Sequence, residues 1–124
     1  MKTIEIDGHT GHSKILVGER LQNLKAYVDQ KKTIVITDDN VAGLYQKDFP
    51  KADVICVGIG ENAKTLETIE KIYHHLIEME ADRSAFLLGI GGGIVCDMTG
   101  FAASTYLRGI AFGYAPTTLL AQVD

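Results

Sequence analysis

The chain has 124 residues, a formal net charge of −4 and 46% hydrophobic residues, which suits one globular domain with a real core. The negative charge and the lack of a basic stripe argue against nucleic acid as a partner. No apolar run approaches the roughly 20 residues of a membrane span, and residues 1–10 lack the apolar segment of a secretory signal, so we expect a cytoplasmic protein without a membrane partner.

The first predicted element is a β-hairpin. Residues alternate between apolar and polar over Thr3–Asp7, the run Ser13–Val17 follows, and turn residues separate the two. His9 and His12 stand three apart, but no further ligand accompanies them, so we interpret them as turn residues rather than metal ligands. Apolar residues at helical spacing then predict a short amphipathic helix over Glu19–Val28.

A run of β-branched residues, Thr33–Thr37, predicts a central strand that is buried on both faces. The polar residues Asp38, Asp39 and Asn40 follow it, before another predicted helix. Acceptors at the carboxyl end of a parallel strand lie where open α/β sheets bind ligands. Capping of the next helix is the alternative role, and one of the three can cap while the other two stay available.

The segment Ala52–Val57 predicts the next buried strand, and a loop with Glu61 and Lys64 follows. Apolar residues recur on one stripe from Leu66 to Ile77, which predicts the clearest helix of the chain. A solvated ion pair is the default interpretation of the two loop charges. Lys64 stands unfavourably near a helix start, which indicates a bound anion or a partner nearby.

The central stretch of the chain is Ser84–Arg108. An apolar run, Ala85–Ile90, meets three consecutive glycines, and small and apolar residues at helical spacing follow. We predict a strand, a tight turn and a helix, an arrangement whose exposed N–H groups suit a phosphate. The spacing is GxGGG rather than the dinucleotide pattern GxGxxG, so a turn without a ligand stays open at this point. Cys56 and Cys96 each stand in an apolar run, and both are predicted to be buried, reduced thiols.

The last predicted elements are a strand over Ile110–Ala115 and a helix that begins at Pro116, Thr117 and Thr118. The alternation of strands and helices predicts an α/β fold, with a parallel sheet flanked by helices on both faces. The chain stops at Asp124 within a helical pattern, so we expect a domain from a longer protein.

The motif GIGGGIVCDMTGFAASTYLRG (residues 89–109), followed by PTTLLAQVD (116–124), resembles the N-terminal domain of the 3-dehydroquinate synthases. These are sugar-phosphate cyclases, distantly related to glycerol and iron-dependent alcohol dehydrogenases. The upstream motifs TDDNV (37–41) and GENAKTLETIEKIY (60–73) extend the similarity from about residue 33 to the end of the chain.

The resemblance implies a Rossmann-like domain over residues 1–124 that binds NAD. A second domain would hold a divalent metal, zinc or cobalt, and the full-length enzymes are commonly homodimers. The family converts 3-deoxy-D-arabino-heptulosonate 7-phosphate to 3-dehydroquinate and phosphate, through transient oxidation of a hydroxyl group by NAD.

The same resemblance assigns residues by motif. It places at the cofactor Asp38, Asn40, Glu61, Lys64, Gly92, Gly93, Ile94, Asp97, Thr117, Thr118 and Leu120. The glycines would let the backbone approach the pyrophosphate, because no side chain blocks it. The substrate would contact Arg108, through its planar guanidinium, and Asp124.

Three features of the family are missing from this chain: a serine and Gly-Gly-Lys segment, the helical C-terminal domain, and its metal ligands. None of the four histidines matches a ligand position. We therefore assign no catalytic residue or metal ligand here and expect no turnover by the chain alone. The alternatives are a domain of another sugar-phosphate cyclase or of a metal-dependent alcohol dehydrogenase, and a non-catalytic nucleotide-binding module.

Overall fold

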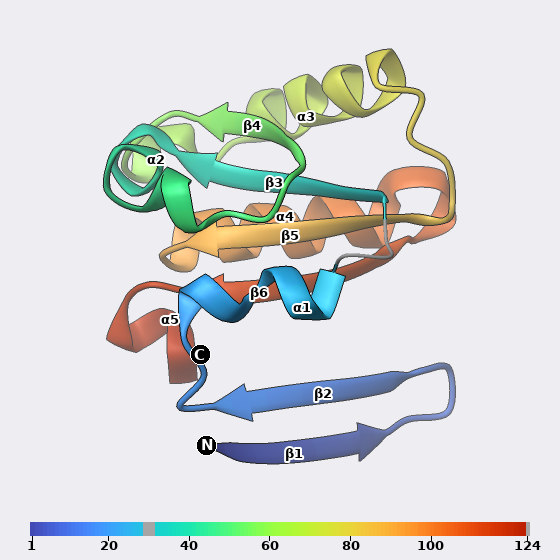
Figure 1. Cartoon of the computed structure of the whole chain (residues 1–124). Coiled ribbons are helices and arrows are strands. Elements are labelled where there is room, and N and C mark those ends of the chain that lie inside the picture. The colour runs from blue at the N-terminus through green and yellow to red at the C-terminus, as the bar shows by residue number, and fades with distance from the viewer. Residues whose placement is uncertain (29–31, 124) are drawn as a thin grey trace.

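The computed structural model describes residues 1–28 and 32–123, and Figure 1 shows the chain as a layered α/β structure with a separate hairpin. In chain order the elements are β1 (Lys2–Asp7), β2 (His12–Val17), η1 (Leu21–Asn23), α1 (Lys25–Val28), β3 (Lys32–Asp38), α2 (Asp39–Tyr45), η2 (Gln46–Asp48), β4 (Asp53–Val57), η3 (Glu61–Ala63), α3 (Leu66–Glu78), β5 (Ala85–Gly91), α4 (Gly93–Thr105), η4 (Tyr106–Arg108), β6 (Ala111–Pro116) and α5 (Leu119–Val123). None of the described helices is long and apolar enough to cross a membrane.

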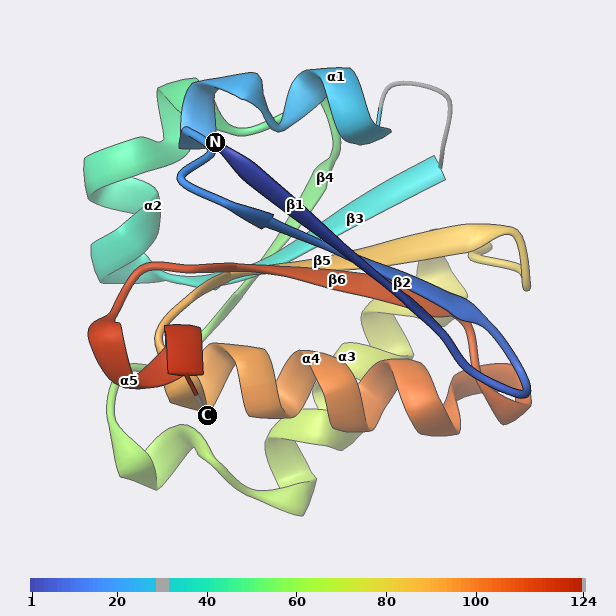
Figure 2. The ribbon, with the colours of Figure 1, turned by 90° about the horizontal axis from the view of Figure 1, so that it is seen from below.

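The main sheet has four parallel strands in the order β4-β3-β5-β6. Helices α3 and α4 cover one face, and α1 and α2 cover the other (Figure 2). The predicted parallel sheet with helices on both faces is therefore confirmed. The predicted N-terminal hairpin is confirmed too, since β1 and β2 pair antiparallel in a sheet of their own.

The prediction of a central strand buried on both faces is also confirmed. All five residues of Thr33–Thr37 in β3 are buried. Alternate side chains of a strand point to opposite faces, so Ile34 and Ile36 pack in one apolar cluster and Val35 in another. Full burial of such a side chain contributes about 1.5–3 kcal/mol. This strand therefore joins the two layers of the core.

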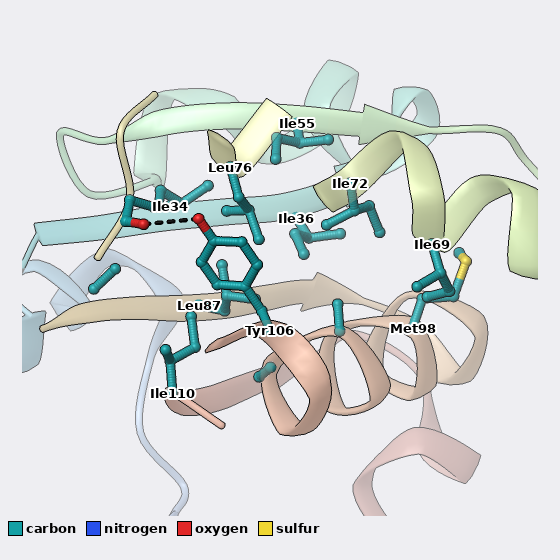
Figure 3. Close-up of a cluster of buried hydrophobic side chains, with 14 of the residues drawn as sticks. Ile34, Ile36, Ile55, Ile69, Ile72, Leu76, Leu87, Met98, Tyr106 and Ile110 are labelled. Atoms are coloured by element: carbon teal, nitrogen blue, oxygen red, sulfur yellow. Dashed lines mark hydrogen bonds between the residues drawn. The ribbon is translucent and has the colours of Figure 1, made fainter. Parts of the chain in front are cut away.

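The larger cluster lies between the sheet and helices α3 and α4 (Figure 3). Ile72 and Leu76 of α3 are almost fully buried against it. The Tyr106 hydroxyl closes one end of the cluster by donating to the Ala81 carbonyl oxygen at 2.7 Å. At the other end of α3, the Thr65 hydroxyl accepts from the Thr68 N–H at 3.1 Å and caps the helix.

Several sequence predictions need correction, among them the start of the last helix, which lies at Leu119 because Pro116 ends β6. The helix expected over Glu19–Val28 is broken into η1 and the short α1. The Glu19 carboxylate accepts hydrogen bonds from the Tyr27 hydroxyl, the Asn23 side chain and the Arg20 N–H, and these lower the pKa of Glu19 to about 2. This local network holds the segment in a tighter turn than a regular helix.

The strand expected over Ala52–Val57 begins one residue later and lies at an edge of the sheet. Cys56 is exposed rather than buried. The reason is that Ile55 and Val57 face the larger cluster, so Cys56 faces the other side, where the seven-residue α2 covers only part of the sheet. Cys96 is buried as predicted, and both cysteines are free.

Candidate functional site

The carboxyl ends of the four parallel strands lie along one edge of the molecule (Figure 1). In open α/β sheets this edge is where ligands bind, because the loops after the strands converge there. The loops after β3, β4, β5 and β6 carry most of the predicted site residues. This shared edge is therefore the candidate site.

The glycine turn between β5 and α4 is the centre of this edge. Gly92 is the N-cap residue of α4 and has no side chain to accept a hydrogen bond from the helix N–H groups. The first turn of the helix contains no acidic residue. The first N–H groups of a helix have no partner within the helix, so those of α4 face the edge without a side-chain acceptor from the cap. A Cβ atom added at Gly93 would meet no atom within 4 Å. The turn thus combines exposed donors with open space.

The other glycines of the turn are needed for packing. A Cβ atom at Gly91 would lie 2.8 Å from the Cβ atom of Val95, and one at Gly92 would lie 3.2 Å from Cγ2 of Thr118. The Thr117 N–H donates to the Gly91 carbonyl oxygen at 2.8 Å. The predicted residues Thr117 and Thr118 are therefore placed directly against the glycine turn.

The residues after Thr117 form the start of α5. The Thr118 hydroxyl accepts from the Ala121 N–H at 3.2 Å and caps the helix. Leu120, also a predicted cofactor residue, is 76% exposed on α5. Ile94 is half-buried in the first turn of α4, where it packs against the larger cluster.

Lys64 and Asp97 form an ion pair across the site. The Lys64 Nζ atom lies 2.7 Å from Oδ2 of Asp97, and both side chains are about half exposed. An exposed pair of this kind contributes at most about 1 kcal/mol to stability. The pair borders a groove of about 280 Å³ between α3 and α4, lined by Lys64, Thr65, Leu66, Ile69, Asp97, Met98 and Phe101.

Asp38 caps helix α2, which is one of the two roles that the sequence left open for the polar residues at the end of β3. Its Oδ1 atom accepts from the Val41 N–H at 2.8 Å at the start of α2. Asn40 and Glu61 are exposed at the same edge, on α2 and η3. The structure therefore brings an amide and a carboxylate to the edge, as predicted, but it also shows a structural role for Asp38.

Arg108 lies away from this edge. It follows α4, whose 13 residues span about 20 Å at 1.5 Å per residue, so it stands at the opposite end of the helix from the glycine turn. Leu107 and Arg108 have φ angles of 48° and 66°, a left-handed conformation that costs non-glycine residues energy. The other predicted substrate residue, Asp124, lies outside the described residues.

The buried Cys96 thiol sits under the turn. Burial raises the pKa of Cys96 to about 11, and the nearby Asp97 carboxylate adds to the shift. Its Sγ atom lies 3.7 Å from the Gly91 carbonyl oxygen. The thiol is therefore protonated at neutral pH and acts as a packing group rather than a nucleophile.

Sequence reasoning missed three residues next to the site. Thr65 and Phe101 line the groove, and the Tyr114 hydroxyl covers Gly100 on α4, where an added Cβ atom would lie 2.2 Å from it. Phe101 stands four residues after Asp97, so helical spacing could have placed it on the same face. Nothing in the sequence indicates that Tyr114 reaches α4, because this contact depends on the order of the strands.

A metal site is not evident in the part of the chain that the structure describes. Within residues 1–28 and 32–123 no three His, Cys, Asp or Glu side chains come together as a possible ligand group. His12 pairs with Asp7 at 2.7 Å in the hairpin. The described donors therefore do not fit a bound divalent ion.

Comparison with known proteins finds relatives whose sequences match the residues of this edge and much or all of the rest of the chain. A family described as the 3-dehydroquinate synthase N-terminal domain matches residues 54–124. The 3-dehydroquinate synthase of Clostridium tetani is 38% identical over 136 aligned residues, which cover 100% of this chain and 36% of that protein. The chain thus spans little more than a third of the curated relatives that it matches over its whole length.

Solved structures match the fold. A 2-deoxy-scyllo-inosose synthase complexed with carbaglucose-6-phosphate, NAD+ and Co2+ superposes with a TM-score of 0.80 at 29% identity, covering 99% of this chain and 37% of that one. A 2-epi-5-epi-valiolone synthase from Streptomyces hygroscopicus with NAD+ and Zn2+ bound gives 0.71 at 28% identity, covering 85% and 32%.

Proposed function

The chain belongs to the 3-dehydroquinate synthase family, in the part described as its N-terminal domain, and on this basis we propose that it binds NAD at the carboxyl edge of the sheet. The observation that carries the proposal is the start of α4, where N–H groups without a side-chain cap face open space at Gly93. Two structural neighbours, both sugar-phosphate cyclases, are described with NAD+ bound.

In this proposal the N–H groups of Gly93 and Ile94 donate to the pyrophosphate, as helix N-termini do for phosphate groups. Asn40 and the free oxygen of Asp38 accept from the hydroxyls at the adenosine end, with Glu61 beside them. Asp97 and its partner Lys64 face the nicotinamide side. Thr117, Thr118 and Leu120 line the side of the proposed cofactor site that is formed by the loop after β6 and the start of α5. Bound NAD would supply a hydride acceptor, and this chain would fix its position.

The metal is proposed to bind outside this chain. The described donors do not form a ligand group, whereas the two cyclase neighbours are described with Co2+ or Zn2+. We derive no catalytic step from the present residues, and we propose that the chain alone does not turn over substrate because the metal and substrate groups cannot be brought together on it.

For the whole protein we propose the conversion of 3-deoxy-D-arabino-heptulosonate 7-phosphate to 3-dehydroquinate and phosphate. The similarity to 2-deoxy-scyllo-inosose synthase supports another sugar-phosphate cyclase as the second candidate. Release of phosphate from each candidate substrate by the whole protein, with and without added NAD, separates the two. Release that does not depend on NAD would contradict both.

The binding proposal is tested with the 124-residue chain by ¹H–¹⁵N NMR titration with NAD, ADP and AMP. We expect NAD and ADP to shift the amide signals of Gly92, Gly93 and Ile94, and AMP to act more weakly because it lacks the pyrophosphate. Shifts confined to another part of the chain would refute the proposal.

The matched variant is Gly93→Asp. The new carboxylate meets open space and suits the positive end of the helix dipole, so the fold should be kept while the pyrophosphate is repelled. We expect at least a tenfold loss of NAD affinity. The control is Gly11→Asp, which adds the same charge in the hairpin turn, where an added Cβ atom also meets nothing within 4 Å. Equal affinities of the two variants would place the dinucleotide elsewhere.

A further inference from the structure

The parallel sheet opens along its middle before it reaches the carboxyl edge. Strand β3 stays in register with β4 up to its last residue, Asp38, and β5 stays in register with β6 up to its last residue, Gly91. Between β3 and β5 the register ends earlier, at Ile36 opposite Gly89. The last two residues of β3 and of β5 therefore lie beyond the pairing that joins the two halves of the sheet.

This opening coincides with a change in the course of the chain. The connection from β3 leads to β4 on one side, and the connection from β5 leads to β6 on the other side. Helix α2, which follows β3, lies on one face of the sheet, and α4, which follows β5, lies on the opposite face (Figure 2). Open α/β sheets bind ligands in the crevice between two such diverging connections. The ends of β3 and β5 therefore form the two sides of the proposed cofactor site.

A side-chain hydrogen bond spans this opening. The Thr37 hydroxyl of β3 donates to the Ile90 carbonyl oxygen of β5 at 2.8 Å. Both residues have an exposed fraction of 0%, so the bond is shielded from water. A buried carbonyl oxygen that loses its donor keeps the full cost of its desolvation. The hydroxyl therefore holds the two strand ends together at a point where the register between them has already ended.

Each of the two strand ends is also fixed to its own half of the sheet. Asp38, the next residue in β3, caps α2 through its side chain. On the other side, Gly91 follows Ile90, and its carbonyl oxygen accepts from the Thr117 N–H at 2.8 Å in the loop after β6. The Thr37 hydroxyl thus links two parts that are each held in place, and it fixes the distance between them.

We propose that Thr37 is a positioning residue for the dinucleotide. Its hydroxyl sets the separation between the groups proposed for adenosine, Asp38 and Asn40, and the glycine turn at the end of β5. This inference rests on the proposed NAD site, and it adds a buried residue that does not itself touch the cofactor. A ligand with two linked parts binds more tightly than either part only when the separation of its subsites matches its linker. Loss of the hydroxyl should therefore weaken the binding of NAD more than the binding of its parts.

The variant Thr37→Val tests the inference, because it keeps the branched shape of the side chain and removes the hydroxyl donor. The 124-residue chain is titrated with NAD, adenosine and inorganic pyrophosphate, and binding is followed by ¹H–¹⁵N NMR. We expect Thr37→Val to bind NAD about tenfold more weakly than the wild-type chain, the effect of one hydrogen bond. Its affinities for adenosine and for pyrophosphate should stay close to those of the wild-type chain. Thr37→Ser keeps the hydroxyl and should bind NAD nearly as well as the wild-type chain.

The matched control is Thr33→Val. Thr33 is also a buried threonine of β3, but it stands near the start of the strand, at the opposite edge of the sheet. Its replacement should leave the affinity for NAD unchanged. Equal NAD affinities of Thr37→Val and Thr33→Val would overturn the inference.

Two further results would overturn it. One is an equal loss of affinity for NAD, adenosine and pyrophosphate in Thr37→Val, because the hydroxyl would then only support the fold. The other is a tenfold loss of NAD affinity in Thr37→Ser, a readout that remains if the valine variant does not fold. Failure of the wild-type chain to bind NAD is a different result, because it would refute the proposed cofactor site and this inference together.

Discussion

Gly91, Gly92 and Gly93 are neighbours in the chain but have different surroundings. The first would clash with Val95 and the second would press on Thr118 if either carried a side chain, whereas the third faces open space. The first two are therefore required by packing. Only the position of Gly93 is open to a ligand.

The Cys96 thiol below this turn makes stability depend on pH. Burial raises its pKa from 9.0 to about 11 in the folded chain, so between those values the unfolded chain binds fewer protons at this residue. Stability therefore falls as pH rises from about 9 to about 11. Cys96→Ala should be less stable at pH 8, because packing is lost, and its deficit should shrink by pH 10. Urea unfolding at both pH values measures this.

The wild-type chain is the reference in that experiment. Tyr27 also has a raised pKa, caused first by its hydrogen bond to Glu19, and its effect is common to both proteins. The raised pKa of Tyr114 comes first from burial, and the contribution that it receives from Cys96 is absent in the variant. A deficit that stays constant from pH 8 to pH 10 would show that the thiol titrates normally and is not buried under the turn.

At the scale of the element, helix α4 packs closely against strand β5 at Gly89. A Cβ atom at Gly89 would lie 2.5 Å from Oγ1 of Thr99, which is itself fully buried and donates to the Val95 carbonyl oxygen. Gly89→Ala should therefore lower the free energy of unfolding by about 1–3 kcal/mol. Urea unfolding followed by circular dichroism measures the loss.

Gly93→Ala is the matched control for this prediction. It adds the same methyl group four residues later, where no atom lies within 4 Å, and alanine favours a helix by up to about 1 kcal/mol over glycine. It should be neutral or slightly stabilising. Equal decreases in the free energy of unfolding for the two variants would mean that α4 does not pack closely against β5 at Gly89.

The sequence predicted most elements because their local signals agree with the packing. Apolar periodicity placed α3, and the β-branched run placed β3 as a fully buried strand. The prediction was wrong where a side-chain network or an edge position decided the result. The Glu19 hydrogen bonds break the first helix, and the edge position of β4 exposes Cys56.

At the scale of the molecule, the order of the strands decides which predicted residues meet. Motif similarity placed Lys64 and Asp97 in one site, and the structure pairs them at 2.7 Å. It assigned Arg108 to substrate as well, yet this residue lies at the far end of α4 from the glycine turn. Residue spacing along the helix gives that separation, because the 13 residues of α4 carry the chain about 20 Å from the glycine turn toward Arg108.

At the carboxyl edge of its sheet the chain carries the proposed dinucleotide site, and no group of metal ligands is found within residues 1–28 and 32–123. A crystal structure of the chain soaked with NAD tests this account most directly. We predict the pyrophosphate within hydrogen-bonding distance of the N–H groups of Gly93 and Ile94, with the adenosine toward Asn40. A dinucleotide bound at the amino end of the strands, near Arg108, would contradict it.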